Sequence, residues 1–213
     1  MRKVLHFYIL PLLAILFSIA LVSCGDDEGE AVPSYITDFL LAETGSNGNV
    51  KRVVLDDGTE YAITSQQIAA DKADSAYRCI ATYTKSDRNI KLYSLESVFS
   101  ALPQDADSFC ISRDSLPRDA VKMLSIWKGR GYINMLLGVM TTGNKNHKYA
   151  FSIDSIKDNT EHVSLVHQRP KEDAESYTDK VYMSMPMQKT EDNVKRFVFH
   201  VNTYDGWKEY SFD

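Results

Sequence analysis

Alternation of apolar and polar residues with a period of two dominates the chain from residue 35 onward, and it constrains the fold more than any other feature. One such run is Thr59-Glu60-Tyr61-Ala62-Ile63-Thr64. Successive side chains of a strand point to opposite faces, so this pattern is typical of half-buried β-strands. No segment of the body shows a convincing 3.6-residue helical period. The sequence therefore predicts an all-β protein.

The first part of the body is predicted to form a small barrel. Strands are expected at residues 35–42, 50–55, 59–64, 77–84 and 90–95. Asp56-Asp57-Gly58 has the composition of a tight hairpin turn with positive φ, and residues 85–89 join a second hairpin. Five short antiparallel strands suit closure into a barrel, because closure removes exposed sheet edges. We assign residues 35–113 to this domain.

An acidic, turn-rich segment from Pro103 to Pro117 is the best internal boundary. Beyond it, strands are expected at residues 121–127, 132–141, 149–156, 162–167, 181–185, 194–202 and 207–212. Strands at this spacing are typical of a β-sandwich, which we assign to residues 118–213.

Several blocks of the body resemble the NigD-like lipoproteins. They include Ile126-Trp127-Lys128-Gly129-Arg130-Gly131-Tyr132-Ile133-Asn134, Val163-Ser164-Leu165-Val166-His167 and Val181-Tyr182-Met183-Ser184. The resemblance implies an N-terminal OB-type barrel and a C-terminal β-sandwich behind a lipoprotein signal. The name of that family comes from a bacteriocin operon, where an immunity role is suspected, and the resemblance supplies no catalytic residue.

The N-terminus has the pattern of a lipoprotein signal peptide over residues 1–23. Two basic residues precede an apolar stretch that ends at Leu21-Val22-Ser23-Cys24, which resembles a bacterial lipobox. The resemblance implies cleavage between Ser23 and Cys24 and attachment of diacylglycerol to the Cys24 sulfur, which reacts as a thiolate. Acyl chains on Cys24 would anchor the protein to a membrane. An ordinary signal peptide or anchor helix is the alternative.

Residues 24–34 form an acidic tether. Asp26, Asp27 and Glu28 resemble the export signal that carries lipoproteins of the Bacteroidota to the outer face of the outer membrane. We therefore predict an outer-membrane anchor that faces the cell exterior. The alternative is a plain solvated linker on a lipoprotein that faces the periplasm.

Charge excludes one class of partner. Without residues 1–23 the chain has 22 basic and 29 acidic residues, a net charge of −7. Nucleic-acid binding needs clustered Lys and Arg, so no nucleic-acid partner is expected. The expected partners are the membrane, through the acyl chains, and an unknown extracellular protein, peptide or glycan.

No motif predicts catalysis, a metal or a cofactor. His162 and His167 are five residues apart on one predicted strand and point to opposite faces, and no carboxylate or cysteine stands at ligand spacing beside the histidines. The sequence has no Gly-x-Ser-x-Gly motif. Catalytic residues that are distant in the sequence can still meet in the fold, so a catalytic site of that kind stays an alternative. Whether Cys79 and Cys110 form a disulfide is undecided.

Two further patterns concern the surface. Ser75, Ser115 and Ser155 each follow an aspartate in a pattern used for O-glycosylation in the Bacteroidota. Near the C-terminus an aromatic cluster could stack on sugar rings, but packing at a sheet edge is the favoured interpretation. Its members are Tyr204, Trp207, Tyr210 and Phe212.

The sequence thus predicts a non-enzymatic surface lipoprotein that binds an extracellular ligand or an envelope partner. The alternatives are a bacteriocin immunity or accessory lipoprotein, a glycan-binding module and, less favoured, a hydrolase.

Overall fold

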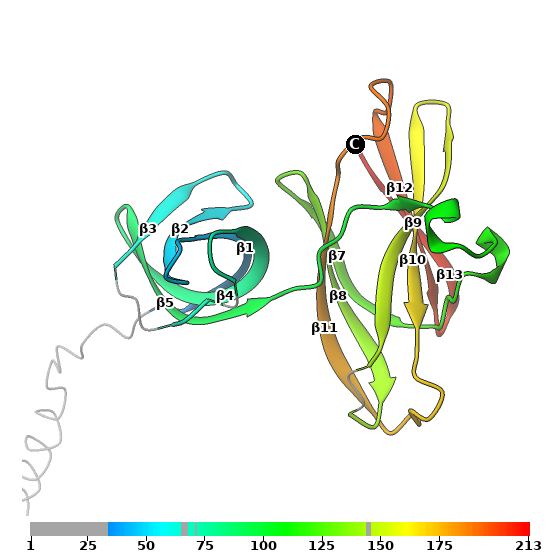
Figure 1. Ribbon diagram of the computed structural model, residues 1–213, viewed down its shortest axis with the longest axis horizontal. Coiled ribbons are helices and arrows are strands. Elements are labelled where there is room, and N and C mark those ends of the chain that lie inside the picture. Colours follow the sequence, from blue (N-terminus) through cyan, green and yellow to red (C-terminus); the bar gives the residue numbers. More distant parts are fainter. Residues whose placement is uncertain (1–33, 65–67, 71, 144–145) are drawn as a thin grey trace, which may run out of the picture. The chain divides into compact units, whose positions relative to one another are not determined.

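The computed structural model describes residues 34–64, 68–70, 72–143 and 146–213. Its regular elements are β-strands and two short 3-10 helices (Figure 1). The strands are β1 (Ile36–Thr44), β2 (Val50–Leu55), β3 (Glu60–Ile63), β4 (Ala76–Ser86), β5 (Asn89–Ser97), β6 (Gln104–Asp105), β7 (Lys122–Gly129), β8 (Tyr132–Thr141), β9 (Lys148–Lys157), β10 (Thr160–Gln168), β11 (Tyr177–Pro186), β12 (Arg196–Thr203) and β13 (Gly206–Phe212); the helices are η1 (Ala106–Phe109) and η2 (Arg113–Ser115). The prediction of an all-β protein is confirmed. The predicted signal peptide and most of the tether lie outside the described residues.

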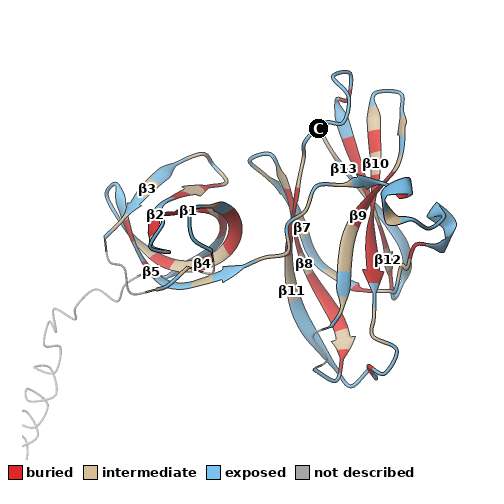
Figure 2. Cartoon of the chain, in the orientation of Figure 1, coloured by how far each residue is buried: buried red, intermediate tan, exposed pale blue. Residues whose placement is uncertain are grey.

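Strands β1 to β5 form a closed barrel in the order β1-β2-β3-β5-β4. Strand β1 pairs with both β2 and β4, and β3 pairs with β5 in parallel. This Greek-key closure is the OB-type arrangement, so that prediction is also confirmed. Apolar residues of β1, β2, β4 and β5 fill the interior, among them Leu40, Val53, Tyr83 and Ile90. Figure 2 shows the buried stretches of the barrel strands in red.

The predicted turn between β2 and β3 is confirmed. Gly58 has φ +88° and its amide donates to the carbonyl oxygen of Leu55 at 2.9 Å. Asp57 accepts a 2.7 Å hydrogen bond from the amide of Thr59. A residue with a Cβ adopts such a positive φ at a cost, which is why glycine stands there.

The second half of the chain forms a sandwich of two sheets. One sheet has the order β13-β12-β10-β9-β6 and the other β11-β8-β7. Their inner faces bury a continuous core that includes Met135, Phe151, Met183 and Phe199. The sandwich prediction is confirmed. Strand β10 pairs with β12 in parallel, because the chain crosses to the other sheet through β11 before it returns.

The segment between the two parts belongs to the sandwich more than the sequence indicates. Residues 104–113 were predicted to belong to the barrel domain, whereas β6 pairs in parallel with β9. This short strand covers an edge of the larger sheet that would otherwise expose the backbone groups of β9. Ala106 and Leu116, from the same segment, are buried.

A buried guanidinium joins the barrel to the sandwich. The side chain of Arg78, on β4, is 2% exposed and forms a two-pronged ion pair with Asp56 at 2.8 and 3.0 Å. It also donates to Ser184 Oγ and to Asn134 Oδ1, both at 3.0 Å. Asn134 Nδ2 donates in turn to Asp56 Oδ2 at 2.6 Å. Barrel and sandwich residues therefore complete one hydrogen-bond network around this charge.

Glycine at position 129 lets the network close. A Cβ on Gly129 would lie 2.1 Å from Asp56 Oδ2 and 2.7 Å from Asn134 Nδ2. The ring of Tyr132 packs against the Arg78 guanidinium, with 4.2 Å between the guanidinium carbon and the ring centroid. Such contacts suit arginine, whose planar fork pairs with a carboxylate and stacks on a ring at the same time.

Loss of the buried guanidinium should destabilise the folded protein strongly. Arg78→Met keeps most of the side-chain volume but leaves Asp56 without its counter-charge, which we expect to cost about 3–5 kcal/mol. Urea unfolding measures this loss. The control is Arg52→Met, because Arg52 pairs with Glu43 and Glu60 on the exposed surface, where ion pairs contribute little. Equal losses in the two variants would contradict the role of the network.

A single methyl group in the junction should also destabilise the protein. Gly129→Ala forces Asp56 or Asn134 to move, and overpacking of this kind typically costs about 1–3 kcal/mol. Gly45→Ala is the matched control, because its added Cβ comes closest to the far end of the flexible Lys51 side chain, at 2.6 Å, and lies 3.3 Å from Asn47 Oδ1. Thermal unfolding measures the stability of both variants. If Gly129→Ala unfolded at the same temperature as Gly45→Ala, the result would contradict a close-packed junction.

Candidate functional site

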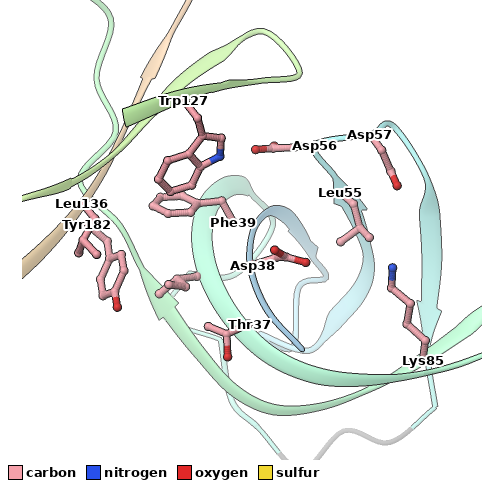
Figure 3. Close-up of a pocket in the computed structure, with 11 residues that line it drawn as sticks. Thr37, Asp38, Phe39, Leu55, Asp56, Asp57, Lys85, Trp127, Leu136 and Tyr182 are labelled. Atoms are coloured by element: carbon pink, nitrogen blue, oxygen red, sulfur yellow. The ribbon is translucent and has the colours of Figure 1, made fainter. Parts of the chain in front are cut away.

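A cleft of about 400 Å³ opens where the barrel meets the sandwich (Figure 3). The barrel contributes residues of β1, β2 and β4 and the turn after β2, and the sandwich contributes one residue each from β7, β8 and β11. The lining residues are Thr37, Asp38, Phe39, Leu55, Asp56, Asp57, Ile80, Lys85, Trp127, Leu136 and Tyr182. Clefts of this size between domains are frequent ligand sites.

One wall of the cleft is aromatic. Phe39 is buried because Trp127 and Tyr182 pack edge-on against it, with ring centroids 5.3 and 5.9 Å away. The Trp127 side chain lies on the edge strand β7 of the smaller sheet, where no neighbouring strand covers it. It keeps 38% of its surface exposed. An indole held in this way can stack on a flat ligand group at little entropic cost, because the ring is already ordered.

The opposite wall is polar. Asp38 Oδ2 accepts a 2.9 Å hydrogen bond from the hydroxyl of Tyr83. Burial, followed by this hydrogen bond to Asp38, raises the pKa of Tyr83, so the phenol stays a neutral donor. The hydrogen bonds from Thr59 lower the pKa of Asp57, and the charge of Lys85 acts in the same direction. The Lys85 ammonium lies over the ring of Tyr61, at 5.4 Å from its centroid.

Some polar groups of the cleft are already paired within the protein, and others are available to bind a ligand. Asp56 already faces Arg78, so its charge is compensated within the protein. Asp38, Asp57 and Lys85 leave two carboxylates and one ammonium on the polar wall. Together with the indole of Trp127 this is a set for hydrogen bonding and stacking, which fits a peptide or sugar segment.

In the sequence these cleft residues fit other roles. Asp56 and Asp57 belong to a predicted turn, and Trp127 belongs to a predicted strand and to a block that resembles the NigD-like family. The one available signal was the large aromatic residue followed by Lys128-Gly129-Arg130-Gly131, which lies at the end of an edge strand. Arg130 in that run donates to the carbonyl oxygen of Gly58, so the run helps to join the two parts of the protein.

The sites predicted from sequence have different places. Ser23, Cys24, Asp26, Asp27 and Glu28 lie outside the described residues. Among the predicted glycosylation sites, Ser115 and Ser155 are exposed, whereas the hydroxyl oxygen of Ser75 is buried. A glycan needs an accessible hydroxyl, which only the first two of these serines offer.

The cysteines and the C-terminal aromatic residues each include both packed and exposed members. Cys79 is buried in β4, where its thiol lies 3.6 Å from the carbonyl oxygen of Leu40, and Cys110 is exposed after η1, so the two form no disulfide. Tyr210 and Phe212 pack against the sandwich core, as the favoured interpretation predicts. Tyr204 and Trp207 instead remain exposed.

The histidines form two pairs that local spacing does not reveal. His147 Nδ1 lies 2.9 Å from His167 Nε2, and His162 Nδ1 lies 3.0 Å from His200 Nε2. His162 and His167 do point to opposite faces of β10, as predicted, and each finds its partner on another segment. Burial lowers the pKa of His167, and its hydrogen bond to the backbone of Asp119 opposes the shift. Burial, followed by the neighbouring His162, lowers the pKa of His200, with Asp154 and Glu209 opposing the shift.

The described residues contain neither a metal cluster nor a membrane-spanning helix. No group of three or more His, Cys, Asp or Glu side chains in this part of the chain is placed to hold a metal ion. None of the helices within the described ranges is long and apolar enough to cross a membrane.

Comparison with known structures gives the same two-part architecture. A NigD-like immunity protein from Bacteroides caccae is 26% identical, with a TM-score of 0.67 over 84% of this chain and 92% of that one. A provisionally named toxin-related protein from Parabacteroides distasonis is 14% identical, with a TM-score of 0.66 over 84% and 92%. A provisionally named lipoprotein from Bacteroides fragilis is 12% identical, with a TM-score of 0.61 over 84% and 96%. The last two show the fold alone.

Comparison of sequences identifies the family. No curated protein matches the chain. The family model of the NigD-like C-terminal beta sandwich domain matches residues 104–213, a range that begins at β6 and ends with the chain. That range is more than half of the protein. The chain therefore belongs to the NigD-like family.

Proposed function

We propose that this protein is a non-enzymatic, lipid-anchored immunity or accessory protein, and that it binds a peptide or protein partner in the cleft between its barrel and its sandwich. The observation that carries the proposal is the exposed, pre-ordered Trp127 opposite the polar groups of Asp38, Asp57 and Lys85. A large aromatic residue of this kind is the usual anchor of a binding hot spot. The similarity to a protein named as a NigD-like immunity protein supports the same class of function.

The geometry of the cleft supports binding rather than reaction. Hydrogen bonds from Thr59 lower the pKa of Asp57, and Asp56 forms an ion pair with the Arg78 guanidinium. General acid catalysis needs a carboxyl group whose pKa is raised towards neutrality. The described lining residues include no serine, cysteine or histidine that would act as a nucleophile or its base.

A glycan-binding module is the second candidate, and one feature of the cleft favours it. An indole face beside carboxylates and an ammonium offers stacking together with both acceptors and donors, which is what a sugar ring requires. Saturable binding of a neutral oligosaccharide to the purified protein, lost in Trp127→Ala, would select this candidate.

The anchor completes the proposal. Acylation at Cys24 and export directed by Asp26, Asp27 and Glu28 would place the cleft on the outer surface of the outer membrane, where it meets an arriving toxin. A periplasm-facing anchor remains the alternative location.

Removal of the exposed indole should abolish protection. A strain that lacks the gene is challenged with bacteriocins from related strains and complemented with wild type, Trp127→Ala or Trp207→Ala. We expect Trp127→Ala to raise sensitivity about tenfold or more, the effect of losing a hot-spot side chain. Trp207 is also exposed, at 56% against 38% for Trp127, but it does not line the cleft, so its variant should protect. Full protection by Trp127→Ala would refute the cleft as the binding site. Unchanged sensitivity of the deletion strain would refute an immunity role.

Replacement of the lipobox cysteine should release the protein from the membrane. Cys24→Ala removes the sulfur that carries the diacylglycerol, so the variant should take up no palmitate analogue and should leave the membrane fraction. The triple variant Asp26→Ala, Asp27→Ala, Glu28→Ala is the control, because it keeps the cysteine and should still be labelled. Labelling of the Cys24→Ala variant would show that the lipobox assignment is wrong.

A further inference from the structure

A chain of buried titratable side chains lies at one end of the sandwich, apart from the cleft. Asp173 Oδ2 lies 2.7 Å from His147 Nε2, and His147 Nδ1 lies 2.9 Å from His167 Nε2. His167 Nδ1 then lies 2.9 Å from the carbonyl oxygen of Asp119. The Asp173 side chain is 0% exposed and that of His147 is 5% exposed, so water does not substitute for these partners.

The number of protons on the two histidines follows from the groups at the two ends of this series of hydrogen bonds, the Asp119 carbonyl oxygen and the Asp173 carboxylate. A carbonyl oxygen only accepts, so His167 Nδ1 must carry a hydrogen to bond Asp119. An ionised carboxylate also only accepts, so His147 Nε2 must carry one to bond Asp173. One more hydrogen is needed between the two rings. Three hydrogens on four ring nitrogens exceed by one what two neutral imidazoles hold, so the pair carries one extra proton and a single positive charge.

The position of that proton follows from the surroundings. Burial would raise the pKa of Asp173, but hydrogen bonds from the amide and hydroxyl of Thr142 at 2.8 and 2.6 Å, and from His147, outweigh burial and hold the pKa well below its usual range. Burial lowers the pKa of His167, although its hydrogen bond to the Asp119 carbonyl oxygen opposes the shift. The contacts stabilise the extra proton best on His147, because Nε2 of this ring faces the Asp173 carboxylate at 2.7 Å, whereas His167 Nδ1 faces only a carbonyl oxygen.

Either change in proton number breaks the chain. With one proton fewer, two lone pairs face each other at one of the three contacts, and a buried polar group loses its partner. With one proton more, two N–H groups face each other across 2.9 Å, and two positive rings stack with centroids 5.2 Å apart. The chain is thus complete in only one protonation state.

Other charged and titratable groups surround the pair without replacing its contacts. His167 stacks on Tyr149, whose ring centroid lies 4.9 Å away. Arg169 donates through its amide to the carboxylate of Asp119 and pairs with Glu175. The remaining groups that act on this end of the sandwich are Asp179, Tyr177 and Tyr204, among the described residues.

We infer that the chain Asp173–His147–His167–Asp119 is a pH-sensitive latch, which closes this end of the sandwich when the histidine pair holds one extra proton and loosens on either side of that state. The latch ties Thr142, at the end of β8, and His167, at the end of β10, to Asp173 and to the segment before β7. It does not involve the cleft, so it stands whether or not the proposed function is correct.

Hydrogen exchange at the Thr142 amide tests the latch directly. This amide donates to Asp173, so its protection in the mature chain, corrected for intrinsic exchange, should pass through a maximum with pH. Loss of a buried hydrogen bond predicts a fall of about tenfold or more on each side. On the acid side, the fall in protection should begin at a pH below the ordinary histidine pKa, because burial lowers the pKa of His167. A flat, corrected profile would overturn the inference.

A variant and a spectrum separate the latch from a general pH effect. His167→Phe keeps a ring against Tyr149, but it lets a neutral His147 donate its one hydrogen to Asp173. The fall in Thr142 protection at high pH should therefore vanish in this variant. The matched control is His162→Phe, from the other histidine pair, which should leave the profile unchanged. If His167→Phe does not fold, imidazole nitrogen NMR of the wild-type protein decides: two protonated nitrogens on His147 at the pH of maximal protection are expected, and one would overturn the inference.

Discussion

The architecture depends on one buried charge. A guanidinium can lie out of water only where acceptors from the protein surround it, and an unpaired buried charge costs several kcal/mol. Arg78 finds its acceptors on both sides, Asp56 in the barrel and Asn134 and Ser184 in the sandwich. Neither part alone completes the set. The same contacts fix Asp56, which also lines the cleft.

Local pattern predicted most of the elements, because strand alternation and turn chemistry are properties of neighbouring residues. The predicted strands at 50–55 and 132–141 have the bounds of β2 and β8. Contacts between distant strands were beyond such reasoning. The parallel pairing of β10 with β12 and the attachment of β6 to β9 depend on which edges meet after the chain has crossed between sheets. The strand pattern predicted a closed barrel, and the family resemblance supplied its OB type.

The candidate cleft was less predictable than the fold, because its residues look ordinary one at a time. Arg78 reads as a polar residue on the outward face of a strand, and Asp56 reads as a turn residue. Only the arrangement of the two parts gives them one function. The histidines show the same limit: the strand period correctly separates His162 from His167, but it says nothing of His147 or His200.

The central claim is that the cleft beside Trp127 receives the partner. Site-specific photocrosslinking in living cells tests it most directly, with a photoreactive phenylalanine placed at position 127 or, for comparison, at position 207. After addition of a bacteriocin against which the protein protects, the account predicts a crosslink to the toxin or to its envelope receptor from position 127 and none from position 207. Crosslinking from position 207 alone would contradict it.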